Sequence, residues 1–134
     1  ARAFAKRLDC TVAMIDKRRV GPNVAKAMNI VGEVNGKVAI ILDDMIDTAG
    51  TLIEAVNAVL DHGGTDVYAA ATHGVLSGPA VDRIKNSKIK QVIVTDTIPL
   101  SPEGKASGKI TQLSVSDILA EAISRIHNYD SVSQ

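Results

Sequence analysis

The chain has 134 residues, of which 46% are hydrophobic and 22% charged, and its 15 Lys and Arg balance its 15 Asp and Glu. This length and composition suit a single packed domain and argue against a disordered chain. Zero net charge argues against a protein that binds nucleic acid or an anionic membrane by bulk charge. The one cysteine, Cys10, excludes an internal disulfide framework and a cysteine-rich zinc site, and we expect a small buried hydrophobic side chain there.

Membrane and export signals are absent from the sequence pattern. No apolar stretch approaches the roughly 20 residues that cross a bilayer. The first seven residues carry charges where a signal peptide would have its apolar region. The sequence therefore predicts a cytoplasmic location.

The zero net charge is a cancellation between two parts of the chain. Residues 1–30 hold seven basic and two acidic side chains, a net charge of +5, and the remaining residues hold eight basic and thirteen acidic, a net charge of −5. No Lys or Arg occurs between Lys37 and Arg83. A chance distribution of surface charge and a functional pairing of the two parts both fit this pattern.

The first part of the chain predicts one helix and two strands. Alanines with Phe4 and Leu8 at helical spacing indicate the end of a helix over 1–8, and residues 11–15 indicate a short strand. The polar segment 16–23 contains Gly21 and Pro22 and predicts a loop, and 24–28 predicts a helical turn. The continuous apolar run over 37–42 is typical of a strand that is covered on both faces.

Strands and helices alternate along the rest of the chain. Apolar positions from 52 to 60 recur at helical spacing, and Gly63 and Gly64 end that helix. The later elements are a strand over 67–71, a helix opened by Gly78 and Pro79, a strand over 91–95, a loop over 101–108, an extended segment over 110–115 and a helix over 117–126. This alternation predicts an α/β fold, a mostly parallel sheet with helices on both faces, in one domain over 1–134.

The segment after the most apolar strand carries the candidate site. In a parallel sheet, ligands bind beyond the carboxyl ends of the strands. Residues 47–51, Asp-Thr-Ala-Gly-Thr, lead there into a helix, whose unpaired N–H groups and dipole favour a phosphate. Gly50 lets the backbone approach an anion closely. The carboxylates of Asp43 and Asp44 can accept hydrogen bonds from sugar hydroxyls or hold Mg²⁺ directly or through water. The spacing suggests a sugar phosphate.

A structural interpretation of the same residues stays open. Asp47 or Thr48 would then only cap the helix, and the aspartate pair would be solvated.

Residues 38–51, a hydrophobic strand followed by two acids and Asp-Thr-x-Gly-Thr, resemble the phosphoribosyl pyrophosphate (PRPP) binding motif of type I phosphoribosyltransferases and ribose-phosphate diphosphokinases (PRPP synthetases). Three other stretches are similar to the synthetases alone. These are Asp-Lys-Arg-Arg at 16–19 with Pro-Asn-Val at 22–24, Ala-Thr-His-Gly-Val-Leu-Ser-Gly-Pro-Ala at 71–80, and the helix from 119 with His127 and 131–133. The resemblance covers essentially the whole chain, as the C-terminal half of a longer enzyme.

The resemblance implies a type I phosphoribosyltransferase-like domain that binds ribose 5-phosphate or PRPP. The family transfers the diphosphoryl group of ATP to the 1-hydroxyl of ribose 5-phosphate, forming PRPP and AMP, with Mg²⁺ as cofactor. Lys17 and Arg19 match its catalytic residues on a mobile loop. The residues implied for ribose 5-phosphate are Arg19, Asp43, Asp44, Asp47, Thr48, Ala49, Gly50 and Thr51. Asp43 and Asp44 are also the candidates for water-mediated metal contact.

The resemblance also implies what this chain lacks. The family's N-terminal half supplies most ATP contacts and metal ligands, so we expect these 134 residues alone to be inactive. Ser131, Val132 and Ser133 match a tail that helps form a regulatory site at a subunit interface, which implies a homo-oligomer. His73 is either a satisfied histidine at a strand end or a ligand contact. The alternative functions are a phosphoribosyltransferase and a non-catalytic regulatory subunit related to the synthetase.

Overall fold

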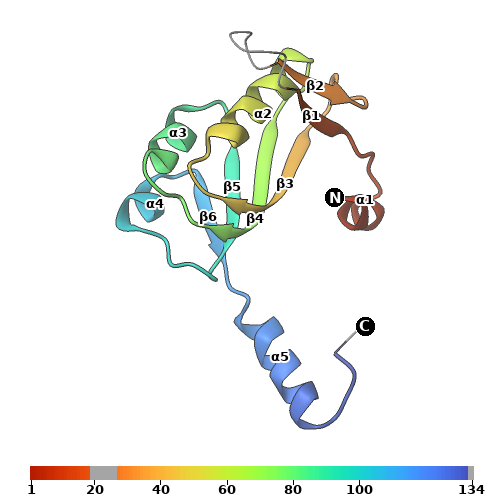
Figure 1. The fold of residues 1–134 in the computed structure, drawn as a ribbon, viewed down its shortest axis with the longest axis vertical. Coiled ribbons are helices and arrows are strands. Elements are labelled where there is room, and N and C mark those ends of the chain that lie inside the picture. The colour runs from red at the N-terminus through yellow and green to blue at the C-terminus, as the bar shows by residue number, and fades with distance from the viewer. Residues whose placement is uncertain (19–26, 133–134) are drawn as a thin grey trace.

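The structure, a computed structural model, describes residues 1–18 and 27–132 (Figure 1). It contains a two-stranded antiparallel sheet and a four-stranded parallel sheet. In the described ranges no helix is long and apolar enough to cross a membrane.

The amino-terminal part forms a helix and an antiparallel pair of strands. Helix α1 (Arg2–Leu8) confirms the helix expected over 1–8. Strand β1 (Met14–Arg18) pairs antiparallel with β2 (Ala27–Val31). The strand expected over 11–15 therefore begins later and extends into the expected loop. The expected helical turn over 24–28 is wrong at residues 27 and 28, which are paired strand residues, and 24–26 lie outside the described residues.

Four parallel strands form the main sheet in the order β3-β4-β5-β6. They are β3 (Ala39–Ile46), β4 (Val67–Gly74), β5 (Gln91–Thr95) and β6 (Ile110–Leu113). Strands β3 and β4 end later than expected, at Ile46 and Gly74, because backbone pairing continues past residues 42 and 71. Asp43 and Asp44 thus lie within a strand.

The helices that connect the strands follow the expected order. Helix α2 (Gly50–Asp61) joins β3 to β4 and ends before Gly63, whose φ of 89° is the left-handed conformation that glycine adopts without strain. Helix α3 (Ala80–Asn86) joins β4 to β5. Residues 101–108, expected as a loop, contain the short helix α4 (Pro102–Ala106), in which the Gly104 N–H donates to the Ser101 hydroxyl over 3.1 Å.

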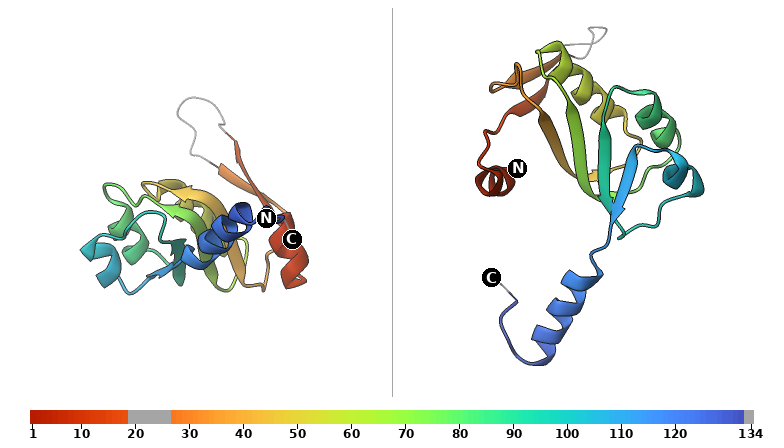
Figure 2. Two further views of the ribbon diagram at one scale, coloured as in Figure 1. Left: turned by 90° about the horizontal axis from the view of Figure 1, so that it is seen from below. Right: turned by 180° about the vertical axis from the view of Figure 1, so that it is seen from behind.

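The hydrophobic core lies on one face of the parallel sheet. Val67, Ala69 and Ala71 of β4 alternate with half-buried residues, and the buried set packs with α2 and α3. Figure 2 shows these two helices on the same side of the sheet. On the opposite face Ile40 is 53% exposed. The expected parallel sheet flanked by helices is confirmed. The expectation of helices on both faces, and of a strand over 37–42 that is covered on both faces, is wrong for the residues described.

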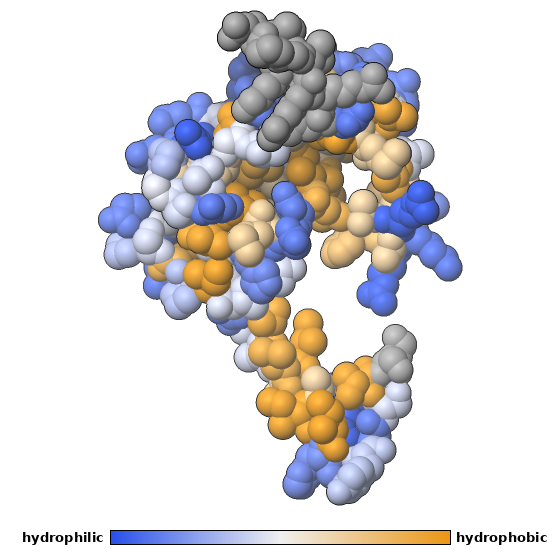
Figure 3. Space-filling view, in the orientation of Figure 1, coloured by the Kyte–Doolittle hydropathy of each residue, from blue (hydrophilic) through white to orange (hydrophobic). Residues whose placement is uncertain are grey.

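Helix α5 (Ser116–His127) extends away from the sheet (Figure 1). Its expected apolar stripe is present but exposed: Ile118 is 70% and Ile123 68% accessible. Figure 3 shows hydrophobic side chains along this helix on the molecular surface. Cys10 is also exposed, in contrast to the buried side chain expected, because it follows α1 outside the core.

Candidate functional site

A short loop joins the end of β3 to the start of α2. Strand β3 ends at Ile46 and α2 begins at Gly50, so three residues make the connection. The N-cap residue is Ala49, with a left-handed φ of 59°, and no side chain caps the helix. The interpretation of Asp47 or Thr48 as a simple cap is therefore wrong. An N-terminus without a side-chain cap offers backbone N–H donors and the positive end of the helix dipole to an anion.

The segment after β4 lies against this loop and bonds to it. The backbone N–H of Leu76 donates to the Ile46 carbonyl over 3.1 Å, and the N–H of Ser77 donates to the Asp47 carbonyl over 3.1 Å. The Ser77 hydroxyl also donates a short hydrogen bond to the Asp47 carboxylate. Asp47 is thus engaged by Ser77 within the protein.

Asp43 and Asp44 are exposed at the end of β3 that leads to α2. The Asp44 N–H donates to the Asp43 carboxylate over 2.9 Å. Both carboxylates are therefore open to solvent at this end of the strand.

Threonines and a histidine gather where β4 and β5 end. His73 Nδ1 lies 2.9 Å from the Thr97 hydroxyl, and the Thr95 and Thr97 hydroxyls both donate to the Thr72 carbonyl, over 2.7 Å and 3.2 Å. His73 is half-buried. The strand-end histidine thus has a protein partner, and the hydroxyl cluster links the two strand ends.

Asp96 follows β5 and links it to the segment before α5. Its carboxylate accepts a 2.9 Å hydrogen bond from the Val115 N–H. Hydrogen bonding from the Ser114 hydroxyl, with the Val115 N–H as the next cause, lowers the pKa of Asp96 below its ordinary value. The carboxylate is therefore stabilised in its charged form.

Metal-binding groups are sparse in the part of the chain that the structure describes. Residues 1–18 and 27–132 contain no cluster of three or more His, Cys, Asp or Glu side chains placed to hold an ion. Mg²⁺, however, is commonly bound by one or two carboxylates together with substrate phosphates and water. The exposed carboxylates of Asp43 and Asp44 fit that kind of site.

The other predicted site residues lie apart from this loop or outside the described residues. Lys17 is in β1 opposite Met28, and Arg19 lies outside the described residues. In the tail, the Ser131 carbonyl accepts a 2.9 Å hydrogen bond from Arg125, and Val132 is 51% exposed. Ser133 also lies outside the described residues.

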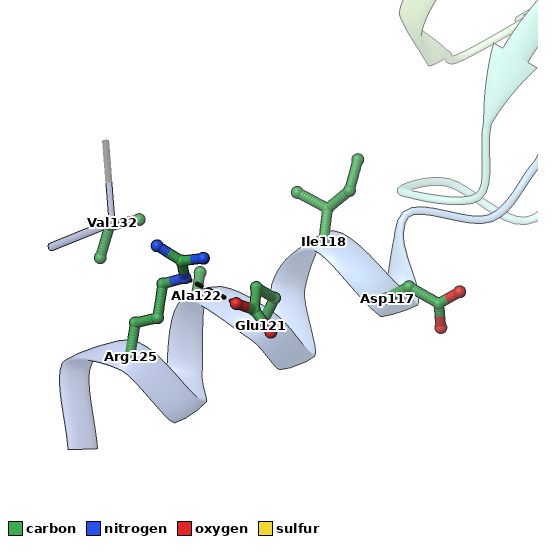
Figure 4. Close-up of a pocket in the computed structure, with 6 residues that line it drawn as sticks. All are labelled: Asp117, Ile118, Glu121, Ala122, Arg125 and Val132. Atoms are coloured by element: carbon green, nitrogen blue, oxygen red, sulfur yellow. Dashed lines mark hydrogen bonds and ion pairs between the residues drawn. The ribbon is translucent and has the colours of Figure 1, made fainter. Parts of the chain in front are cut away.

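Two surface hollows lie near these elements. One, of about 380 Å³, lies between α5 and Val132, and Figure 4 shows Arg125 beside it with its ion pair to Glu121. The other, of about 470 Å³, lies between α2 and α3 and is lined in part by Gly50 and Arg83. The second hollow reaches Gly50, the residue that follows the loop between β3 and α2, whereas the lining of the first belongs to α5 and the tail.

Sequence reasoning missed Arg83, which contacts the loop from α3. Its Nη1 donates to the Thr48 carbonyl over 2.9 Å. Arg83 is 35 positions from Thr48 in the sequence. No local pattern indicated this contact. Ser77 was found only as part of the 71–80 resemblance, without its bond to Asp47.

Comparison with known proteins identifies the family. Residues 18–134 match the model of the phosphoribosyl synthetase-associated domain. The chain is 59% identical over 134 residues to a ribose-phosphate pyrophosphokinase of Caldanaerobacter subterraneus, and 56% identical over 133 residues to that of Bacillus subtilis. The two matches cover 100% and 99% of this chain, and each covers 42% of the relative.

A solved structure shows the same fold. The crystal structure of phosphoribosylpyrophosphate synthetase from Mycobacterium smegmatis matches with a TM-score of 0.80 at 37% identity, covering 96% of this chain and 42% of that one. The chain spans less than half the length of these relatives, and the expected placement as their C-terminal half gains no support from the matches. At this level of identity and coverage, the chain belongs to the family of phosphoribosyl synthetase-associated domains.

Proposed function

We propose that this chain is the ribose 5-phosphate- and PRPP-binding domain of a ribose-phosphate diphosphokinase. The observation that carries the proposal is the uncapped start of α2 at Gly50, joined by a three-residue loop to the strand that carries the exposed carboxylates of Asp43 and Asp44. An anion-binding helix end beside hydroxyl-binding carboxylates suits a sugar phosphate. The name of the relatives, ribose-phosphate pyrophosphokinase, supports the same substrate.

In this proposal the backbone N–H groups of residues 49–51 bind the 5-phosphate, with the hydroxyls of Thr48 and Thr51 as further donors. Asp43 and Asp44 accept hydrogen bonds from the ribose hydroxyls. These contacts hold the 1-hydroxyl in place for reaction, and such positioning is a large part of catalysis in phosphoryl transfer.

The proposed reaction is diphosphoryl transfer from ATP. The ribose 1-hydroxyl oxygen forms a bond to the β-phosphorus, the bond from that phosphorus to the α–β bridging oxygen breaks, AMP leaves, and the hydroxyl proton passes to solvent. Lys17 and Arg19 neutralise charge on the transferred group in this proposal. Bound Mg²⁺ supplies further neutralisation of phosphate charge, with Asp43 and Asp44 as its candidate ligands here.

Binding of ribose 5-phosphate by the 134-residue chain tests the proposal directly. Calorimetric titration should detect binding, and Asp43→Asn should weaken it about tenfold, equivalent to about 1.4 kcal/mol. Asp61→Asn is a matched control, since Asp61 is an exposed aspartate at the far end of α2. Equal affinity in both variants would show that Asp43 does not contribute to ribose 5-phosphate binding. No binding by the unmodified chain would overturn the proposal.

Turnover tests the enzyme assignment. We expect the 134-residue chain to form no AMP from ATP and ribose 5-phosphate, because it spans 42% of its relatives. The full-length Bacillus subtilis relative is the positive control. In a full-length protein that carries this chain, Lys17→Ala should abolish turnover while ribose 5-phosphate binding is kept. Release of pyrophosphate from PRPP and a nucleobase would instead indicate a phosphoribosyltransferase. Homo-oligomerisation, the cytoplasmic location and the regulatory role of 131–133 stay predictions.

A further inference from the structure

We propose that Arg83 is a positioning residue for phosphate binding, and that residues 76–83 act as a clasp on the loop between β3 and α2. The inference rests on the proposed function, since it concerns the loop to which we assign the sugar phosphate. It adds a residue that lies outside the motif at 43–51. It also includes the contact of the Asp47 carboxylate with Ser77.

The clasp holds the carbonyl groups of three consecutive residues, the last of β3 and the first two of the loop. Ile46 and Asp47 each accept from a backbone N–H of residues 76 and 77, and Thr48 accepts from the Arg83 guanidinium. The Asp47 carboxylate adds a fourth contact, to the Ser77 hydroxyl. All of the donors come from the connection between β4 and α3 or from α3 itself. The loop is therefore fixed by an element distant in sequence.

The contact at Thr48 sets the direction of the next backbone N–H. A trans peptide is planar, so its C=O and N–H point in opposite directions. Because the Thr48 carbonyl is aimed at Arg83, the Ala49 N–H is aimed away from Arg83. The Ala49 φ of 59° is unfavourable for an alanine, and conformations of this kind persist where surrounding contacts determine them. Arg83 thus stabilises the peptide orientation that presents the Ala49 N–H.

The position of Arg83 beside α2 explains why the role suits arginine. A Cβ built on Gly50 would lie 3.4 Å from Arg83 Nη1, so the guanidinium lies next to the first residue of α2. Its planar group of donors can hold a carbonyl in a fixed geometry, whereas a lysine offers one flexible ammonium. Its charge adds to the positive end of the helix dipole.

The test uses the 134-residue chain with Arg83→Met and Arg83→Lys. Lys85→Met is the matched control, because Lys85 is another exposed cation on α3. Calorimetry with ribose 5-phosphate should show at least a tenfold loss for Arg83→Met, a smaller loss for Arg83→Lys and no change for the control. Inorganic phosphate should follow the same order.

A measurement without ligand separates positioning from direct contact. In ¹H–¹⁵N NMR spectra of the free chain, Arg83→Met should shift the Ala49 amide resonance, with the melting temperature close to that of the unmodified chain. Ser77→Ala is a second variant, which removes only the hydrogen bond from the Ser77 hydroxyl to the Asp47 carboxylate. It should weaken binding and shift the amide resonances of the same loop. Unchanged ribose 5-phosphate affinity in Arg83→Met, or an Ala49 resonance that does not move, would overturn the inference. If the unmodified chain binds no ribose 5-phosphate, the proposed function fails, and the Ala49 resonance still decides whether the clasp exists.

Discussion

Replacing Ile84 with alanine should show how strongly α3 is held to the sheet. Ile84 is 0% exposed and belongs to the hydrophobic core. Truncating a buried isoleucine to alanine removes three carbon atoms and leaves a cavity, which costs about 2–5 kcal/mol of unfolding free energy. Domains are stable by only about 5–15 kcal/mol, so this substitution should remove a large fraction of the total.

Ile123→Ala is the matched control. The substitution is the same and the residue again lies on a helix, but Ile123 on α5 is 68% exposed. The change in helix propensity is therefore shared, and only the burial differs. Surface substitutions usually change stability by less than about 0.5 kcal/mol, and that is the expected size here.

Urea denaturation followed by circular dichroism measures both changes. With a slope of about 2 kcal/mol per molar urea, the midpoint should fall by about 1–2.5 M for Ile84→Ala and by less than about 0.3 M for Ile123→Ala. Similar shifts for the two variants would refute the reasoning. A large effect of Ile123→Ala would show that α5 packs its apolar stripe against protein in solution.

Gly64→Ala should destabilise the chain by roughly 1–3 kcal/mol, because a Cβ there would lie 2.6 Å from a Val59 side-chain carbon and 2.9 Å from its carbonyl oxygen. An unchanged urea midpoint would contradict this crowding. Gly104→Ala should stabilise α4 by about 0.5–1 kcal/mol, since its Cβ meets neighbours only from 3.5 Å and alanine favours helix; a lower melting temperature would speak against it. Hydrogen bonding from the Ser114 hydroxyl lowers the pKa of Asp96 from 3.8, so its stabilisation is present above that pH and is lost as the pH falls through the lower folded pKa. Asp96→Asn should therefore cost stability at pH 7 and progressively less below pH 3.8; a difference that stays constant with pH would be inconsistent with this linkage.

Local pattern was a good guide where one element's own residues decide its structure. The strand predicted over 91–95 matches β5 in its bounds, and the periodic apolar residues from 52 to 60 predicted the body of α2. The strand β1 and the short helix α4 were misread. Residues 16–18 of β1 are charged and α4 contains proline and glycine, so both segments resemble loops in sequence. Backbone pairing with β2 in one case and an N-cap at Ser101 in the other decided the outcome.

For the candidate site, too, the sequence predicted the local feature and the fold decided the contacts. The order of Asp43, Asp44 and residues 47–51 along the chain was enough to predict a phosphate-binding loop at the end of a strand. The roles within that loop depended on contacts across the fold. Only the tertiary structure turns the Asp47 carboxylate toward Ser77 and brings Arg83 to the Thr48 carbonyl, because the sheet places β4 and α3 beside the end of β3.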